Sequence, residues 1–304
     1  MEEDVYKKYK LAGKIAADAR DYGAELIKPG ISFLEVANAV ESKIKENGAG
    51  LAFPVNISIN EIAAHYSPTH DDTSTFMKGN VVKLDVGAHV DGYIADTAIT
   101  IEVETNNYDK MITASSEALE AAIERMKPNV DLSGIGKSIS ETIKSYGYKP
   151  IDNLTGHSLR QYNLHSGISV PNVAEVFNKS MPREGDVLAI EPFATDGKGH
   201  VISGDGSNIY LCEKSFKSRV IRDNKSKLLF NRIHSNFKTL PFAERWCEKL
   251  FSNCEFALKR LTFSGLLMQY PQLVDAGQGI VTQKEHTVII TEDGCEVTTS
   301  GRRD

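Results

Sequence analysis

Apolar side chains in the first sixty residues change their spacing at clear breaks. Residues 5–27 have apolar positions at helical intervals, and Lys28-Pro29-Gly30 is a sequence that ends helices. Ser32-Phe33-Leu34-Glu35 has the form of a capping box, which predicts a second amphipathic helix over residues 33–47. Residues 51–59 have a strand-like pattern. We therefore expect two helices that lead into a sheet.

Two apolar runs after residue 80 predict a β-hairpin. They meet at the turn dipeptide Asp91-Gly92, and each contains one aspartate, Asp85 and Asp96. A four-residue loop would place these carboxylates directly opposite one another, whereas a two-residue loop would make them diagonal neighbours on the same face. Like charges on one face of a sheet repel. A shared proton, a cationic side chain or a bound metal would relieve that repulsion; the alternative is that one aspartate points to solvent.

The pattern then repeats. A helix is predicted over residues 109–126, and the segment 127–149 matches the segment 28–50 at an offset of 99 positions. The strand that ends at Asp85 also matches one that ends at Glu191, at an offset of 106. A duplicated α/β half accounts for two long repeats better than a solenoid, whose shorter units recur at least three times. Two such halves facing each other would bring four carboxylates to one centre: Asp85, Asp96, Glu191 and Glu285.

His157 lies between the two carboxylate pairs in the sequence and follows a glycine that permits close approach. A single histidine is more often a hydrogen-bonded polar residue than a ligand, but a neutral ring nitrogen suits a site rich in carboxylates. Four carboxylates balance the charge of two divalent cations, and bridging carboxylates would hold such a pair about 3.5–4 Å apart. Two metals at that spacing can deliver hydroxide near neutral pH, which predicts hydrolysis.

Composition limits the class of protein. The chain has 304 residues, of which 41% are hydrophobic and 25% charged, and its formal net charge is −6. These values are typical of a soluble globular protein and argue against one built wholly around nucleic acid. The sequence has no apolar run of membrane-spanning length and no signal-peptide pattern, so we expect a cytoplasmic protein with no membrane contact. The four cysteines are widely spaced and are expected to be reduced thiols.

Seven motifs stand in order along the chain. They are Ala64-His65-Tyr66-Ser67-Pro68, Lys83-Leu84-Asp85-Val86-Gly87, Asp91-Gly92-Tyr93-Ile94-Ala95-Asp96, Gly156-His157-Ser158, Leu164-His165-Ser166-Gly167-Ile168-Ser169-Val170-Pro171-Asn172, Ala189-Ile190-Glu191-Pro192-Phe193 and Glu285-His286-Thr287. Together they resemble the motif set of type II methionine aminopeptidases in their archaeal form, over about residues 5–299. The resemblance implies an α/β (α+β) pita-bread fold, in which pseudo-twofold-related halves surround a central antiparallel sheet, in agreement with the repeat.

The resemblance also implies a role for each ligand candidate. Asp85 is implied to chelate one metal, and Asp96 and Glu285 to bridge two metals. His157 and Glu191 are implied to complete the coordination of the second metal. The expected cofactor is two divalent ions per chain, and Mn(II), Fe(II), Co(II) and Zn(II) all suit this mixture of oxygen and nitrogen ligands.

Contacts with the substrate are implied in the same way. Glu191 is implied to move the proton, and His65 and His165 to contact the scissile amide and its carbonyl. Phe53 and Ile209 fall at positions that match the methionine side-chain pocket. Ile209 lies in a region where the loops of the family vary.

The second carboxylate pair is separated by 94 positions and the first by 11, so equivalent halves require an insertion of about eighty residues. A loop of that length is unusual in a compact domain. We expect one pita-bread catalytic domain, residues 1–304, with an inserted helical subdomain at about residues 208–274; Thr239-Leu240-Pro241-Phe242-Ala243 and Trp246 resemble the type II insertion. Two predicted helices carry the apolar residues Leu228, Leu229, Ile233 and Phe237, and Phe242, Trp246 and Leu250. A third predicted helix and the segment that leaves it carry Phe256, Leu258, Leu261 and Leu266.

The function that follows is removal of the initiator methionine from nascent polypeptides, as a step of protein maturation, by a metallo-aminopeptidase that acts as a monomer. Two alternatives remain. Proline-directed pita-bread peptidases share the ligand order but usually carry a separate N-terminal domain, and the 84 residues before Asp85 leave no room for one beyond this half's own helices. Non-catalytic pita-bread binding proteins lose ligands, and none is missing here.

The predicted insertion is also basic. Residues 214–260 have a formal charge of +8 and the rest of the chain has −14, and such asymmetry can mark contact with nucleic acid. We hypothesise that the insertion docks on the ribosome, whose surface is largely RNA phosphate; the alternative is that these side chains only aid solubility. The basic residues are Lys214, Lys217, Arg219, Arg222, Lys225, Lys227, Arg232, Lys238, Arg245, Lys249, Lys259 and Arg260.

Overall fold

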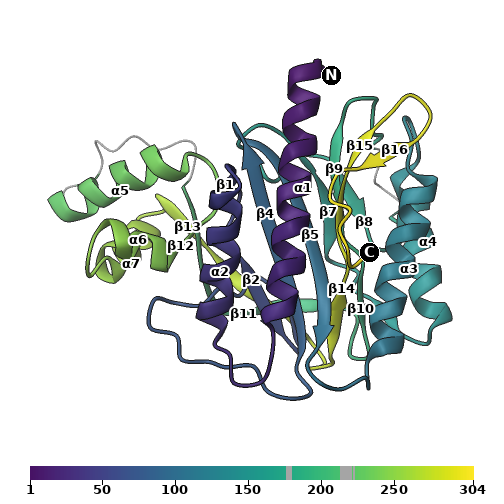
Figure 1. Cartoon of the computed structure of the whole chain (residues 1–304), viewed down its shortest axis with the longest axis horizontal. Helices are drawn as coiled ribbons and strands as arrows, with labels where there is room; N and C mark the ends of the chain where they lie inside the picture. The colour runs from purple at the N-terminus through teal and green to yellow at the C-terminus, as the bar shows by residue number, and fades with distance from the viewer. Residues whose placement is uncertain (176–179, 213–220, 222) are drawn as a thin grey trace.

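The first half of the fold is a sheet covered on one face by two helices (Figure 1). We describe it from a computed structural model, which covers residues 1–175, 180–212, 221 and 223–304. Strand β4 pairs with β5 along one edge and with both β1 and β2 along the other. The elements are α1 (Glu3–Leu26), α2 (Phe33–Glu46), β1 (Gly50–Leu51), β2 (Asn56–Ile59), β4 (Val81–Val90) and β5 (Tyr93–Glu102).

Local sequence signals account for most of these boundaries. The Ser32 side chain accepts a hydrogen bond of 3.1 Å from the Glu35 backbone N–H, so the predicted cap of α2 is confirmed. The single extended segment predicted over residues 51–59 is wrong, because β1 and β2 are separate strands. Pro54 lies in the gap between them and cannot donate a hydrogen bond to a neighbouring strand.

The hairpin of β4 and β5 has a two-residue turn. Asp91 and Gly92 both have positive φ, 51° and 86°, as a tight hairpin turn of this kind requires. Val90 pairs with Tyr93, Gly87 with Asp96, and Asp85 with Ala98. The two aspartates are therefore diagonal neighbours on one face, which selects the second of the two loop alternatives.

The second half repeats the first with the offsets seen in the sequence. Helices α2 and α4 both have 14 residues and begin 99 positions apart, and β4 and β9 begin 106 positions apart. One sheet has the order β16-β15-β9-β7-β8 and a smaller one the order β14-β10-β6. The elements are α3 (Asp109–Arg125), α4 (Leu132–Ser145), β6 (Lys149–Pro150), β7 (Thr155–Leu159), β8 (Ser169–Pro171), β9 (Val187–Ile190), β10 (Phe193–Thr195), β14 (Val281–Gln283), β15 (His286–Ile290) and β16 (Cys295–Val297).

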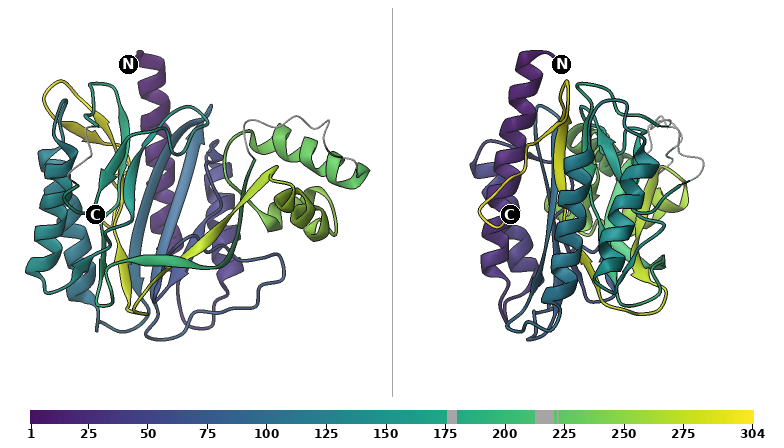
Figure 2. Two further views of the ribbon diagram at one scale, coloured as in Figure 1. Left: turned by 180° about the vertical axis from the view of Figure 1, so that it is seen from behind. Right: turned by 90° about the vertical axis from the view of Figure 1, so that its right-hand side faces the viewer.

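Helices α5, α6 and α7 lie on the side of the molecule opposite α3 and α4, as both Figure 1 and Figure 2 show. They interrupt a long antiparallel pair, β11 with β13, and β3 pairs with the other edge of β13. Whether this region is a separate subdomain stays a prediction. The elements are β3 (Ile62–Ala64), β11 (Val201–Cys212), α5 (Asn224–Phe237), β12 (Phe242–Ala243), α6 (Glu244–Leu250), α7 (Glu255–Phe263) and β13 (Leu267–Asp275).

The apolar stripes predicted for these helices are partly wrong. Leu228 is 46% exposed and Phe256 is 70% exposed, and Phe230 is buried instead. Since α5 packs on the other helices through Leu229, Phe230 and Ile233, the contact face is rotated from the one read off the sequence. Cys247, Cys254 and Cys295 are free thiols, as expected. Cys212, Cys247 and Cys254 are buried in this region.

A buried ion pair joins the helical region to the first half. Arg245 of α6 pairs with Glu41 of α2 and donates a 2.7 Å hydrogen bond to the Ser67 hydroxyl. The indole N–H of Trp246 donates to the same Glu41 carboxylate at 2.8 Å. Removal of either charge would leave the other buried and unpaired, which is strongly destabilising. No helix among the described residues is both long enough and apolar enough to cross a membrane.

Candidate active site

The four carboxylates come from corresponding places in the two halves. Asp85 lies on β4 and Asp96 on β5, whereas Glu191 directly follows β9 and Glu285 directly precedes β15. In the second half, the pair His286–Ile190 and the pair Phe193–Gln283 belong to one register, so Glu191 and Glu285 lie opposite one another between them.

Backbone pairing within the second half is weak beside these two glutamates, where the Lys284 N–H donates to the Pro192 carbonyl at 3.4 Å. Pro192, which follows Glu191, has no N–H to donate. The Glu285 N–H turns to the first half and donates to the Ala98 carbonyl at 3.1 Å. Glu285 is thus held by β5 as much as by its own sheet.

Two threonines tie the halves together at the same place. The Thr287 hydroxyl accepts a hydrogen bond from the Asp96 N–H and donates one to the Asp96 carbonyl, both at 2.8 Å. The Thr97 hydroxyl donates to the Glu285 carbonyl at 2.9 Å. The relative position of Asp96 and Glu285 is therefore fixed by side chains that cross between the halves.

All nine site residues predicted from the sequence line one cavity of about 70 Å³. The cavity also has walls that the prediction missed. Ala64 and Leu164 are neighbours of the motif histidines, and Pro241 belongs to the motif of the insertion, so the sequence held a signal for each. Asn56 and Tyr270 had none. The predicted residues are Phe53, His65, Asp85, Asp96, His157, His165, Glu191, Ile209 and Glu285.

The carboxylates are crowded and buried. Burial raises the pKa of Asp85 to about 7. Burial, and then repulsion between the carboxylates, holds the pKa values of Asp96, Glu191 and Glu285 well above their usual range. No lysine or arginine occurs among the described residues that line the cavity. Of the three ways to relieve the repulsion, a cationic side chain is excluded, and a shared proton or a metal remains.

The free ligand atoms fit a metal better than a proton alone. Ligand atoms of Asp96, His157 and Glu285 all lie within 4.8 Å of one another. His157 Nε2 is 3.6 Å from an Asp96 oxygen and 3.7 Å from a Glu191 oxygen, too far for hydrogen bonds. One buried oxygen of Asp85 and one of Asp96 have no hydrogen-bond partner. Burial also lowers the pKa of His157, so its ring is uncharged and offers a neutral nitrogen donor. This donor set suits divalent cations.

The remaining walls offer neutral imidazoles and apolar surface. Burial lowers the pKa of His65 to about 4, so its ring is uncharged near neutral pH. The His165 ring lies 4.4 Å from the His157 ring, centroid to centroid. Phe53 and Ile209 are 5% and 3% exposed. A Cβ at Gly87 would overlap the Phe53 ring, so this glycine makes room for the apolar wall.

Residues 7–292 match the family model of metallopeptidase family M24. The chain belongs to metallopeptidase family M24. A protein of Methanocaldococcus jannaschii named methionine aminopeptidase is 49% identical over 299 residues, 98% of this chain and 100% of the relative. One of Saccharolobus solfataricus with the same name is 45% identical, over 98% of this chain and 99% of the relative. These matches confirm the predicted family and its archaeal form.

Solved M24-like structures share the fold. Methionine aminopeptidase from Thermotoga maritima has a TM-score of 0.72 at 24% identity, over 99% of this chain and 98% of that one. The structure of a thermophilic Arx1 gives 0.85 at 17% identity, over 98% and 91%. Prolidase from Pyrococcus furiosus gives 0.64 at 20% identity, and this chain covers only 65% of it. The α/β pita-bread fold expected from the sequence is confirmed.

Proposed function

We propose that the chain removes the N-terminal methionine from polypeptides and that two divalent cations take part in the hydrolysis. It is a metal-dependent aminopeptidase, since it belongs to metallopeptidase family M24 and matches relatives named methionine aminopeptidase over their full length. The observation that carries the proposal is the joining of five ligand candidates, two neutral histidines and an apolar wall in one buried cavity.

Asp85, Asp96, His157, Glu191 and Glu285 would hold the metals, with Asp96 and Glu285 shared between them. When bound, two divalent cations would supply Lewis-acid activation of the scissile carbonyl and of a water molecule. Mn(II), Fe(II), Co(II) and Zn(II) are the candidates. A calorimetric titration of metal-free protein with each ion measures the stoichiometry, for which we expect two.

Protein groups supply the proton transfer and the orientation of the substrate. Glu191, at the cavity wall, would accept a proton from the attacking water and give it to the leaving nitrogen. His65 and His165 are neutral hydrogen-bonding groups for the scissile amide and its carbonyl. Because the titratable side chains that line the cavity are buried, each of these contacts is stronger than it would be in water.

Phe53 and Ile209 would bind the methionine side chain. Peptides that begin Met-Ala or Met-Gly should be cleaved, Met-Leu and Met-Lys peptides much less, and Ala-Pro peptides hardly at all. Turnover of Met-Ala-Ser by protein isolated without added metal, together with metal analysis of the same sample, tests the proposal. Preferential release of residues that precede proline would instead support the proline-directed alternative.

Ribosome docking through the basic segment stays a narrower proposal. Lys214, Lys217, Arg219 and Arg222 lie outside the described residues. Arg245 is buried against Glu41 and cannot reach a phosphate, so it is removed from the set. Lys225 and Lys227 are exposed on α5 and form no ion pair among the described residues. The predicted monomeric state and cytoplasmic location also stay predictions.

Co-sedimentation with ribosomes tests the docking. Each neutralised phosphate adds about 0.7–0.9 to the slope of log affinity against log salt concentration. Changing Lys225 and Lys227 to Glu should therefore weaken binding and flatten its salt dependence, with Met-Ala-Ser turnover unchanged. Binding that does not respond to salt, or no binding at low salt, would end the proposal.

A further inference from the structure

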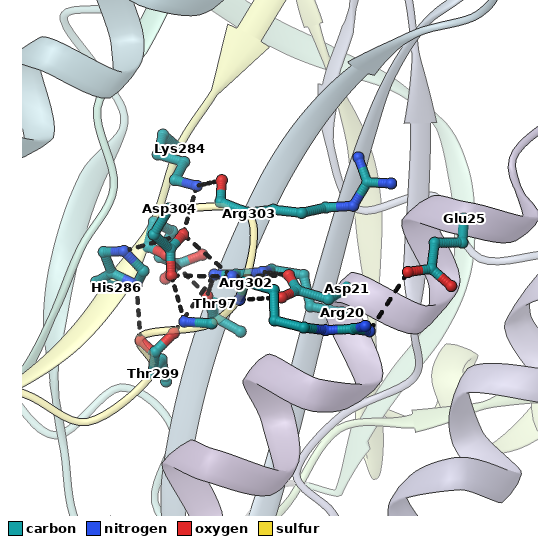
Figure 3. Close-up of polar contacts among 12 residues, drawn as sticks. Arg20, Asp21, Glu25, Thr97, Lys284, His286, Thr299, Arg302, Arg303 and Asp304 are labelled. Carbon is teal, nitrogen blue, oxygen red and sulfur yellow. Dashed lines mark hydrogen bonds and ion pairs between the residues drawn. The ribbon is translucent and has the colours of Figure 1, made fainter.

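A largely buried ionic cluster joins Arg20 and Asp21 of α1 to Lys284, His286 and Asp304 (Figure 3). Neighbouring residues of a strand point to opposite faces, so Thr97 points away from the cavity that Asp96 lines. Lys284 and His286 flank Glu285 in the same manner, and none of these three residues lines the cavity. The cluster therefore touches the backbone that carries the shared ligands, from the side opposite the proposed metals.

Asp304 is the centre of this cluster. Its carboxylate accepts a 2.6 Å hydrogen bond from the Lys284 ammonium and lies 3.1 Å from the Arg20 guanidinium. His286 Nε2 is 3.4 Å from the same carboxylate. Lys284 and His286 are the residues on either side of Glu285, so one carboxylate restrains both neighbours of a ligand candidate.

Arg20 extends the cluster to the other shared ligand. It is a fully buried residue of α1, and it pairs with Asp21 at 2.9 Å. Its guanidinium also donates a 2.8 Å hydrogen bond to the Thr97 hydroxyl, which in turn donates to the Glu285 carbonyl at 2.9 Å. A continuous chain of polar contacts thus runs from Asp304 through Arg20 and Thr97 to Glu285.

The segment that carries Asp304 is fitted closely against α1. A Cβ at Gly13 of α1 would overlap the Thr298 carbonyl, so only glycine allows this approach. The Arg302 N–H donates a 2.6 Å hydrogen bond to Asp21, and the Thr299 hydroxyl contacts His286 Nδ1 at 2.9 Å. The position of Asp304 is therefore defined by backbone as well as by charge.

The location of the cluster matches a gap in the sheet. Backbone pairing in the second half is weak beside Glu191 and Glu285, where the Lys284 N–H donates to the Pro192 carbonyl at 3.4 Å, so Glu285 lacks the full support of strand hydrogen bonds there. A ligand without that support needs other contacts to keep its orientation, and such outer contacts typically change metal affinity by about 10–100-fold.

We propose that Asp304 is a positioning residue for a pair of divalent cations: by holding Lys284, His286 and Arg20 it keeps the carboxylates of Asp96 and Glu285 at the spacing the pair needs. The inference rests on the proposed function for the identity of the ligands. It assigns no contact between Asp304 and metal or substrate.

The test is a titration of metal-free protein with Mn(II), followed by calorimetry and by electron paramagnetic resonance, which distinguishes a coupled pair of Mn(II) ions from isolated ones. D304A should weaken the more weakly bound ion by about 10–100-fold. When two Mn(II) ions are added per protein chain, D304A should show the spectrum of isolated ions in place of the coupled signal. The matched control is E25A, which removes the exposed 3.3 Å ion pair with Arg302 in the same segment and should change neither readout.

Two further variants keep the test decisive if D304A fails to fold. D304N retains the shape of the side chain, and T97V removes only the hydroxyl between Arg20 and Glu285. Each variant should weaken binding of the second Mn(II) ion. The loss of Mn(II) affinity in the double variant of D304N and T97V should be smaller than the sum of the two single losses, because both residues belong to one chain of contacts. D304E should partly restore the coupled signal.

The outcomes separate this inference from the proposed function. If folded D304A or D304N binds two Mn(II) ions with parent affinity and a parent spectrum, the positioning role is wrong. The same holds if E25A causes an equal loss. If the parent protein itself binds no pair of ions, the proposed two-metal function fails, and this inference fails with it.

Discussion

The two halves of the molecule present equivalent carboxylate pairs on different supports. In the first half, Asp85 and Asp96 are diagonal neighbours on ten-residue strands joined by a two-residue turn. In the second, Glu191 and Glu285 lie directly opposite one another, in a gap between short strands, and are 94 positions apart in the chain. The first pair lies within one continuous strand ladder, whereas the second lies where the ladder of its own half is weak, although Thr287 contacts Asp96 from the other half as well.

The covering helices differ in the same sense. Helices α1 and α3 end 99 positions apart, so the repeat places Leu119 of α3 where α1 has Arg20. Leu119 is 1% exposed and packs in an apolar core, whereas Arg20 is equally buried and makes polar contacts with four residues. These are Asp21, Thr97, Thr299 and Asp304. At this equivalent position the covering helix of the second half packs through an apolar side chain, whereas that of the first half forms an ionic cluster.

The largest expected effect tests the shared ligands. Asp96→Ala or Glu285→Ala removes a carboxylate that both metals would use, so both ions should bind more weakly and turnover should fall below detection. Glu191→Ala should leave one ion better bound than the other and lower turnover by about 10²–10⁴-fold through loss of the proton acceptor. Calorimetry and Met-Ala-Ser turnover measure both. Parent stoichiometry and activity in Asp96→Ala would refute the shared ligand.

The next effect concerns the connection between the helical region and the first half. Arg245→Ala leaves Glu41 buried without its partner, and we expect a loss of about 3–5 kcal/mol in the free energy of unfolding. Urea unfolding measures this. A double variant, Arg245→Met with Glu41→Gln, removes both charges and should recover much of the loss. If the single and double variants are equally unstable, packing rather than the ion pair holds the two regions together.

A smaller effect is expected at Gly87, which the first half needs for its apolar wall. In Gly87→Ala the new methyl group overlaps the Phe53 ring, so the ring must move within the cavity. We expect KM for Met-Ala-Ser to rise by roughly tenfold or more, in the range that one poor contact costs in an apolar pocket. The metal stoichiometry should stay at the parent value. A fall in kcat with unchanged KM would point instead to disturbance of Asp85 or Asp96.

The smallest effect is the reference for all the others. Lys259 and Glu255 form an exposed ion pair one turn apart on α7, at 2.6 Å. Lys259→Ala should change the free energy of unfolding by less than about 0.5 kcal/mol, because exposed pairs are screened by water and salt. A cost comparable to that of Arg245→Ala would show that the helical region is held by its surface charges.

Local signals in the sequence were enough for the helix ends, the repeat and the ligand candidates. Ser32 caps α2 with its own side chain, and the offset of 99 reappears in the helix boundaries, because capping and periodicity depend on neighbours in sequence. The family motifs brought nine residues to one cavity, whereas their individual roles stay predictions.

What the sequence did not predict depends on partners that are distant along the chain. Tyr270 enters the cavity from a strand of the inserted region, and no local motif marks it. Arg245 was counted among surface charges, yet its partner is Glu41, 204 positions away. The choice between two hairpin loops also required the register. Helical periodicity indicates an apolar stripe but not which part of it a neighbouring element covers. For that reason the pattern wrongly predicts that Leu228 and Phe256 are buried.

Two buried cysteines of the helical region, Cys247 and Cys254, can report how often that region opens. Burial raises the pKa of Cys254 to about 12 and holds that of Cys247 further above its usual range, so both stay protonated and unreactive while the helices are closed. A thiol reagent can then modify them only during an opening of this region. The rate of cysteine modification would therefore measure how often the helical region opens, at positions outside the catalytic cavity. Because Pro241 of this region lines the cavity, the same rate would report how often that wall is displaced.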